Sequence, residues 1–227
     1  GICSFDLNTG KFNNLASPVD NKPVWKDRSI SAITGDGRGN IFISDWGNTG
    51  ILLLNKEKKE LVNILEANAN SNFSFSFLQC LFYDSHKVLW AGTREGIIRI
   101  SNLDEFEKNG FKGKLDVSNY FPGITNHSLR PLSCFAISED RNGNIWMGGT
   151  NGLFVFNYSN NTITRYTHIE GNKSSLSDNE VRSIYISGND VWIGTNTGGL
   201  NHFDPVTITF TAFTIENGLP NNSIYNI

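Results

Sequence analysis

The chain has 227 residues, of which 38% are hydrophobic, 12% aromatic and only 18% charged. This low charge, with a net charge of −3, excludes a protein that binds nucleic acid or a membrane surface through bulk positive charge. The aromatic content excludes a disordered chain, and no apolar run approaches the roughly 20 residues that a membrane-spanning helix needs.

An internal repeat is the strongest signal in the sequence. Four similar segments are centred on large aromatic residues: Phe42, Trp90, Trp146 and Trp192. A few residues after each aromatic, a glycine precedes an apolar stretch; these glycines are Gly50, Gly96, Gly152 and Gly199. A period of roughly 40–50 residues with several short strands per unit is typical of β-propeller blades.

Each unit predicts four strands in an antiparallel meander. The first strand precedes the aromatic (30–33, 78–81, 134–137 and 183–186), the second contains it, and the third begins at the glycine. The fourth follows a second polar turn, as at 163–166 and 210–213. Turns rich in Asp, Asn and Gly separate the strands. Only 103–109 predicts a short helical turn, and the repeated aromatics are expected to fill the wedge between blades.

We therefore predict an all-β fold, with one β-propeller segment over residues 1–227. Four complete four-stranded antiparallel blades are expected at about 28–66, 76–117, 130–168 and 180–214, and partial blades at 1–16 and 221–227. Both ends fall within a unit, so we expect an arc of a larger, seven-bladed propeller whose edges need a neighbour. The alternative is a closed five-bladed ring in which the C-terminal strand pairs with the N-terminal ones.

Several stretches resemble the two-component regulator propeller repeat, namely 142–153, 176–205 and 218–224. The unit around Trp90 departs from this pattern, because Asp84–Lys87 replaces the Asp-x-x-Gly-Asn turn and an insertion of about Leu103–Arg130 follows its third strand. The unit around Phe42 has Phe for Trp, and Ser-Asp-Trp at 44–46 where Gly-Thr is usual.

The resemblance implies a sensory ectodomain. In that family, tandem seven-bladed propellers precede a small β-sandwich, one membrane span and a histidine kinase, and sense oligosaccharides in the periplasm of Bacteroides-like bacteria. It implies a periplasmic, non-enzymatic segment without a cofactor, attached to an inner-membrane histidine kinase. Its expected partners are an oligosaccharide or other small polar ligand, the remaining blades and downstream domains of the parent chain, and a second copy in a homodimer. Nucleic acid is not an expected partner.

Candidate ligand-binding residues lie in the loops that join strands two and three and in those between blades, which usually form a propeller's binding face. Planar polar groups bind vicinal hydroxyls, and an indole stacks on a pyranose. The candidates are Trp46, Arg94, Trp25, Asp45, Glu95, Arg130, Asn151 and Asn196. Trp46 is out of phase with the repeated aromatics, and its competing interpretation is a rim tryptophan packed on a neighbouring loop. Arg94 and Arg130 suit uronate or sulfate groups, or are solvated loop arginines.

Catalytic and metal-binding motifs are absent from the sequence. It has no Gly-x-Ser-x-Gly elbow, phosphate loop or His-Glu-x-x-His pattern, and its four histidines lie at non-equivalent positions in different units. We therefore predict neither catalytic residues nor a metal site. Three cysteines exclude a complete disulfide framework, and Cys80 and Cys134 are expected to be buried free thiols on neighbouring inner strands.

Three functions remain to be separated. The first is an extracytoplasmic sensor that binds a glycan fragment and relays the signal to a histidine kinase. The second is a protein-interaction or dimerisation scaffold, which a large apolar exposed patch without a polar pocket would favour. The third is a propeller lyase, which needs a convergent set of His, Tyr and Arg near the axis.

Overall fold

The computed structural model describes residues 2–14, 29–46, 50–55, 60–64, 77–119 and 133–227. Four antiparallel four-stranded sheets follow one another along the chain. Blade 1 is β3 (Ile30–Gly35), β4 (Asn40–Asp45), β5 (Ile51–Asn55) and β6 (Glu60–Asn63). Blade 2 is β7 (Cys80–Tyr83), β8 (Leu89–Gly92), β9 (Ile97–Ser101) and β10 (Asp116–Asn119). Within each blade, every strand pairs with the next in sequence.

The later blades repeat this order. Blade 3 is β11 (Cys134–Glu139), β12 (Ile145–Gly149), β13 (Gly152–Asn157) and β14 (Thr162–Tyr166). Blade 4 is β15 (Val181–Ser187), β16 (Asp190–Thr195), β17 (Leu200–Asp204) and β18 (Thr209–Phe213). A separate hairpin, β1 (Cys3–Asp6) and β2 (Lys11–Asn14), precedes blade 1, and a 3-10 turn, η2 (Ile215–Asn217), follows blade 4. The predicted all-β blade architecture is confirmed.

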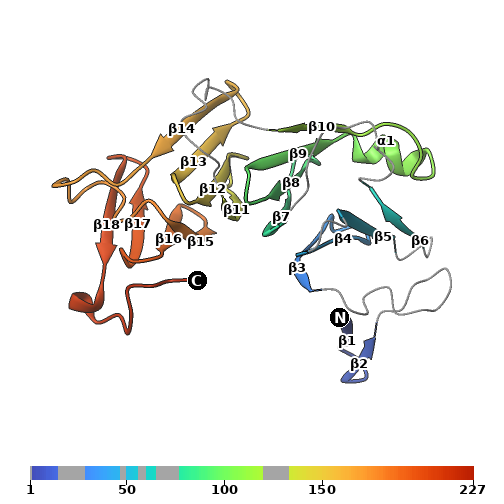
Figure 1. Ribbon diagram of the computed structural model, residues 1–227, viewed down its shortest axis with the longest axis horizontal. Coiled ribbons are helices and arrows are strands. Elements are labelled where there is room, and N and C mark those ends of the chain that lie inside the picture. The colour runs from blue at the N-terminus through green and yellow to red at the C-terminus, as the bar shows by residue number, and fades with distance from the viewer. Residues whose placement is uncertain (1, 15–28, 47–49, 56–59, 65–76, 120–132) are drawn as a thin grey trace.

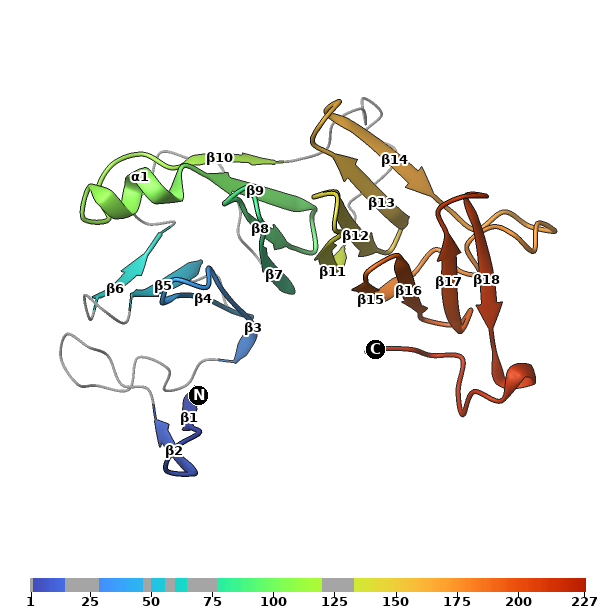
Figure 2. The ribbon, with the colours of Figure 1, turned by 180° about the vertical axis from the view of Figure 1, so that it is seen from behind.

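The blades lie side by side in an arc, with the first strand of each blade on the inner side (Figure 1). Contacts join β3 to β7, β7 to β11, and β11 to β15. Seen from behind, the β1–β2 hairpin and the C-terminal segment lie at the two ends of the arc (Figure 2). The described strands thus form an open arc, in which the C-terminal segment does not pair with the N-terminal hairpin.

Aromatic side chains fill the wedge between successive blades. Phe42, Trp90 and Trp146 are buried, and each belongs to a core cluster that contains residues of the following blade. Trp192 differs from the expectation that all four repeated aromatics are core residues. It is half-buried and contacts His202 and Phe213 of its own blade.

An aspartate in the turn between the first two strands holds the tryptophan that follows it. The Asp84 side chain accepts hydrogen bonds from the Val88 amide (2.8 Å) and from Trp90 Nε1 (2.7 Å). Asp140 makes the same two contacts with Asn144 and Trp146. The turn at Asp84 lacks the expected glycine, but Lys87 adopts the left-handed conformation there, with φ at 65°. The aspartate therefore preserves the turn despite the altered sequence.

Asp84 also joins blade 2 to blade 3. It accepts a hydrogen bond from the Tyr158 hydroxyl, and the Tyr158 ring stacks on His86 with 3.8 Å between ring centroids. Burial and the adjacent Asp84 carboxylate raise the pKa of Tyr158, which keeps its hydroxyl protonated as a donor. A buried carboxylate with several donors is the arrangement in which burial of a charge is tolerated.

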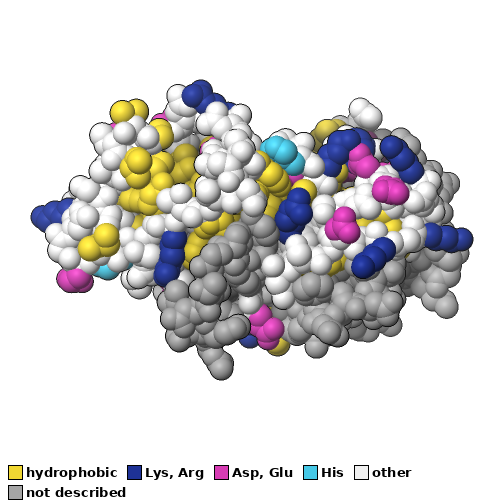
Figure 3. Space-filling model, turned by 90° about the horizontal axis from the view of Figure 1, so that it is seen from above, with side chains coloured by type: hydrophobic (Ala, Val, Ile, Leu, Met, Phe, Trp, Pro, Cys, Tyr) yellow, Lys and Arg dark blue, Asp and Glu magenta, His cyan; other side chains and the backbone are white. Residues whose placement is uncertain are grey.

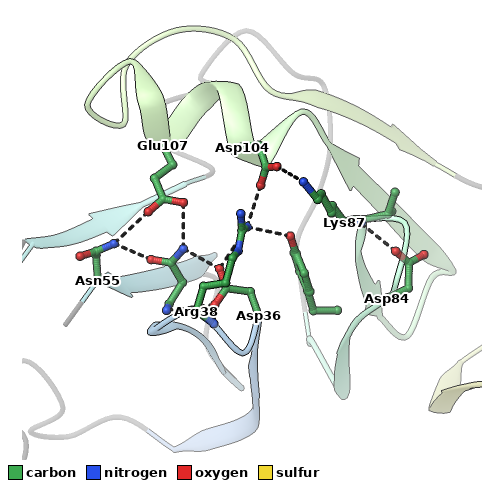
Figure 4. Close-up of polar contacts among 10 residues, drawn as sticks. Asp36, Arg38, Asn55, Asp84, Lys87, Asp104 and Glu107 are labelled. Carbon is green, nitrogen blue, oxygen red and sulfur yellow. Dashed lines mark hydrogen bonds and ion pairs between the residues drawn. The ribbon is translucent and has the colours of Figure 1, made fainter. Parts of the chain in front are cut away.

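A short helix forms a polar clasp between blades 1 and 2. The helix α1 (Leu103–Lys108) follows β9 and lies over both blades, with Leu103 and Phe106 buried. Its Asp104 accepts hydrogen bonds from Arg38 of blade 1 (2.7 Å) and from Lys87 of blade 2 (2.5 Å), as Figure 4 shows. Its Glu107 accepts from Asn40 (3.1 Å) in blade 1.

Charged groups of both signs surround this clasp on the surface. In the view from above, Lys, Arg, Asp and Glu gather on the half of the molecule that contains α1 (Figure 3). Arg38 also donates to the Tyr83 hydroxyl of β7 at 3.2 Å, so one guanidinium contacts both the helix and the inner strand of blade 2. The clasp therefore restrains the turns between the first and second strands of blades 1 and 2.

We predict that Gly148→Ala destabilises the junction between blades 3 and 4. A Cβ at Gly148 would lie 2.4 Å from Val181 Cγ1 and 3.0 Å from Val181 Cβ, so β12 and β15 would have to separate. The expected loss in free energy of unfolding is about 1–3 kcal/mol, measured by denaturant unfolding. Val181→Ala in the Gly148→Ala background should recover part of that loss, and strict additivity in this double-mutant cycle would contradict the steric explanation.

We predict that Asp104→Asn weakens the clasp at neutral pH. The hydrogen bonds from Lys87 and Arg38 lower the pKa of Asp104, so the stabilisation is present above the unfolded-state pKa near 4 and is lost as the pH falls through the folded-state pKa. For this partly exposed group we expect a loss of about 1 kcal/mol at pH 7.

Thermal unfolding of both proteins between pH 2 and 7 checks this expectation. The difference between wild type and Asp104→Asn should shrink below pH 4, because protonation removes the same charge from the wild type. Glu105→Gln is the matched control, since Glu105 is an exposed carboxylate on the same helix. An equal effect of both substitutions would show that the contacts of Asp104 do not matter.

Candidate functional site

An exposed cluster of aromatic and cationic side chains lies where blades 1 and 2 meet, at the opposite end of the strands from the clasp. Trp46 directly follows β4, and its backbone N–H donates to the Ser29 carbonyl at 2.9 Å. Arg94 lies in the turn between β8 and β9. Its guanidinium carbon is 5.9 Å from the Trp46 ring centroid and 4.4 Å from that of Phe77. We call Trp46, Arg94 and Phe77 the aromatic–arginine cluster.

The aromatic–arginine cluster is open to solvent. Trp46 and Phe77 are 45% and 41% exposed, although aromatic rings of this size usually bury most of their surface. Phe77 has a φ of 57°, a left-handed conformation that is uncommon for a bulky residue and is found at functional positions. Solvent contact of two large rings beside a cation is typical of a binding surface rather than of a core.

The charge of Arg94 is available in this cluster. Among the residues that the structure describes, no carboxylate forms an ion pair with it. Its position is set by the turn, in which Thr93 donates from its backbone N–H and its hydroxyl to the Gly96 carbonyl (2.8 and 3.0 Å). Guanidinium groups bind planar carboxylate and sulfate-like oxyanions through paired hydrogen bonds, and the rings can contact an apolar sugar face.

Sequence reasoning selected Trp46 and Arg94 separately, and the structure brings them together. Phe77 was not among the predicted site residues. It belongs to a run in which Ser and Phe alternate, and such alternation is typical of a β-strand and not of a binding loop. Glu95 is exposed next to Arg94, and its backbone N–H donates to Thr93 Oγ1 at 3.0 Å. Asp45 precedes Trp46 but is buried, so its side chain is not presented on the surface with the indole.

The other predicted site residues are distributed along the arc. Asn151 is half-buried in the turn between β12 and β13, where its carbonyl accepts from Arg165 Nε at 2.9 Å. Asn196 directly follows β16 of blade 4, whereas Trp46 directly follows β4 of blade 1, and these two blades lie towards opposite ends of the arc (Figure 1). Trp25 and Arg130 lie outside the described residues. The described members of the predicted set therefore do not form one continuous site.

A second polar cluster surrounds Asn196. Its side-chain Nδ2 donates to Glu180 Oε2 at 3.2 Å, and its Oδ1 accepts from the Tyr225 hydroxyl at 3.4 Å. Glu180 also accepts a hydrogen bond from Arg182 of β15. We call Glu180, Arg182, Asn196 and Tyr225, together with Phe135, the Arg182 cluster.

The described histidines do not converge on one site, and Cys80 of blade 2 contacts Cys134 of blade 3. His86 stacks on Tyr158, His168 Nδ1 lies 2.9 Å from the Leu176 carbonyl, and His202 contacts Asp190. Within the described part of the chain, no group of three His, Cys, Asp or Glu side chains could hold a metal ion. Cys134 is a buried free thiol; its contact with Cys80, together with burial, raises its pKa.

Proteins of two-component systems are similar to this chain in sequence. Residues 128–151 and 175–197 match the sequence model of the two-component regulator propeller. A histidine kinase of Formosa agariphila is 32% identical over 260 residues, which span 94% of this chain and 19% of the relative. None of the described helices is both long enough and apolar enough to cross a membrane.

Solved structures share the fold. The extracellular domain of a hybrid two-component system from B. thetaiotaomicron is 25% identical with a TM-score of 0.62, over 88% of this chain and 24% of that one. A second such domain from B. thetaiotaomicron is 16% identical with a TM-score of 0.70, over all of this chain and 27% of that one, and shows the fold alone. The chain thus spans about a quarter or less of each of these proteins.

The resemblance that the sequence predicted is confirmed by these matches. The stretches around Trp146 and Trp192 that carry it are the ones covered by the family match, and 88% of the chain is similar in structure to the extracellular domain of a hybrid two-component system. The chain carries two-component regulator propeller repeats and forms a β-propeller segment of the kind found in hybrid two-component systems.

Proposed function

We propose that the chain is an extracytoplasmic sensor segment that binds an oligosaccharide with an anionic group and relays its presence to a histidine kinase. Extracellular domains among its structural relatives and the kinase among its sequence relatives support the location and the output. The observation that carries the ligand assignment is the Arg94 guanidinium, lying without an ion pair among the described residues between two exposed rings.

The chemistry of the aromatic–arginine cluster suits a uronate or sulfated sugar. The guanidinium supplies a fork of N–H donors that matches the two oxygens of a carboxylate or sulfate. Trp46 offers an indole face on which the C–H face of a pyranose can stack. Glu95, exposed beside Arg94, can accept hydrogen bonds from sugar hydroxyls.

The position of the cluster suggests how binding is transmitted. Trp46 belongs to blade 1 and Arg94 to blade 2, so a ligand that contacts both favours one relative orientation of these blades. At the other end of the same strands, the clasp made by Asp104 holds blades 1 and 2 together. A ligand shifts a conformational equilibrium only if it binds one conformation more tightly than the other. Here the two conformations are two orientations of blade 1 relative to blade 2, and a ligand that contacts both blades can bind one orientation more tightly.

We predict that Arg94→Ala weakens binding of acidic oligosaccharides by about tenfold or more, the effect expected for losing a hydrogen-bonded charge pair. The measurement is isothermal titration calorimetry of the intact ectodomain that contains this chain, with oligogalacturonates and sulfated glycosaminoglycan fragments as probes. Trp46→Ala should weaken the same interaction through loss of stacking. Affinity should fall as salt rises, because the pair is solvent-exposed.

Arg141→Ala is the matched control. Arg141 is an exposed arginine in the turn between β11 and β12, at the end of the strands opposite to the aromatic–arginine cluster, so its removal changes net charge equally and should leave binding unchanged. Equal weakening by Arg94→Ala and Arg141→Ala would indicate general charge attraction. Absence of binding to every acidic probe would reject the proposed ligand class.

A scaffold function has one observation in its favour. The β1–β2 hairpin exposes Phe5, Leu7 and Phe12, a group of apolar side chains that suits contact with another protein surface. Light scattering of the intact ectodomain with Phe12→Ser separates the two functions. Loss of a dimer without loss of glycan binding would assign the hairpin to assembly and leave the aromatic–arginine cluster as the sensing site.

A further inference from the structure

Neighbouring blades approach each other at a glycine of the second strand. A Cβ at Gly92 in blade 2 would lie 3.0 Å from the Cβ of Cys134, and one at Gly148 in blade 3 would lie 3.0 Å from the Cβ of Val181. Cys134 begins β11 and Val181 begins β15, and both residues are buried. They are therefore equivalent residues at two successive junctions between blades.

The residue opposite that glycine in its own blade completes the contact. Cys80 is opposite Gly92 in the pairing of β7 with β8, and Ala136 is opposite Gly148 in the pairing of β11 with β12. The junction of blades 2 and 3 thus places Cys80 beside the start of β11, where the next junction has an alanine beside Val181. Since Ala and Val pack this position one blade later, packing by itself does not require two sulfur atoms.

The two cysteines contact each other as free thiols. Cys80 Sγ donates to the Cys134 carbonyl oxygen at 3.6 Å, and both side chains border the open face of Gly92. The strands that carry them, β7 and β11, pack directly against each other. A disulfide forms only between cysteines that are already close and whose side chains approach each other, and this junction meets that condition.

The two thiols differ in their access to solvent. Cys134 is buried, whereas Cys80 is half-buried. The contact with Cys80, together with burial, raises the pKa of Cys134, so Cys134 stays protonated in the resting protein. The attacking species in thiol–disulfide exchange is an accessible thiolate. Cys80 is therefore the thiol that a small oxidant reaches first, and Cys134 is placed to react with the product.

We propose that Cys80 and Cys134 form a redox modification site, at which a low-molecular-weight disulfide converts the two thiols into a disulfide between blades 2 and 3. The Cys80 thiolate attacks one sulfur of the oxidant, which forms a mixed disulfide and releases one thiolate that takes up a proton. Cys134 then loses its proton and attacks Cys80 Sγ, and the second thiol of the oxidant leaves. The two cysteines lose two electrons and two protons, and the oxidant is reduced to two thiols.

The new bond joins the inner strands of two blades that already contact each other at another place. Tyr158 donates to Asp84, and the Ser85 N–H donates to Glu139 at 2.9 Å, so hydrogen bonds restrain the turns of these blades. The disulfide adds a covalent restraint on the inner side of the arc and fixes the orientation of blade 2 relative to blade 3. Oxidation in the cell rests on the extracytoplasmic location proposed above, but the chemistry of the pair does not.

Peptide mapping by mass spectrometry tests the proposal on the intact ectodomain that contains this chain. The folded protein is equilibrated with glutathione disulfide, and its free thiols are alkylated before digestion. Most molecules should yield a pair of peptides joined through Cys80 and Cys134, and dithiothreitol should separate that pair. The matched control combines Cys80→Ala with Cys134→Val, which are the residues that the chain itself uses at the next junction. This variant should fold and should lack the linked peptides.

Single variants test the order of the two steps. Cys134→Val should leave Cys80 as a stable mixed disulfide with glutathione, whereas Cys80→Ala should leave Cys134 unmodified in the folded protein because it is buried. Modification of Cys134 in the Cys80→Ala variant at the rate of an exposed thiol would contradict that order. The proposal is overturned if both cysteines of the wild type stay free, if the reaction stops at the mixed disulfide, or if the link forms only in denaturant.

Discussion

The wedge-shaped space between neighbouring sheets is the constraint on which this structure depends. Sheets that radiate from an axis diverge towards the outside, and the space between them must be filled to the density of a protein interior. Trp90 and Trp146 fill it, each buried against the following blade. Their indole N–H groups would be costly to bury without acceptors, and Asp84 and Asp140 supply these at 2.7 and 3.0 Å. One turn residue therefore both closes a hairpin and completes the packing between blades.

Because the wedge aromatics occupy the space between the sheets, polar and charged side chains lie at the two ends of the strands. At the end that contains the first turn of each blade, polar contacts such as those of Asp84 and Asp104 tie neighbouring blades together. At the other end, the turns that carry Arg94 and Asn196 are exposed or half-buried. In the function proposed above, a ligand that binds at a junction of blades would favour one orientation of the two sheets, and that preference would be the physical basis of the signal.

Two arginines of the same fold are placed in opposite electrostatic settings. Arg94 lies against exposed aromatic rings without an ion pair among the described residues, whereas Arg182 lies against similar rings but is paired with Glu180. Since the rings are comparable, the Glu180 carboxylate is what makes the electrostatic environment of Arg182 different from that of Arg94.

Sequence patterns were sufficient to predict the repeat, the strand order within each blade and three of the four wedge aromatics, Phe42, Trp90 and Trp146, because alternation and turn residues act over a few positions along the chain. They also selected Trp46, Arg94 and Asn196 by their place in the turns. Three outcomes depend on tertiary packing instead: Trp46 meets Arg94 and Phe77, Asp45 is buried beside an exposed indole, and Asn196 joins Glu180 and Tyr225. These contacts depend on how separate sheets stack and on single bulged or left-handed residues, such as Arg182 and Phe77, whose conformations no local sequence pattern encodes.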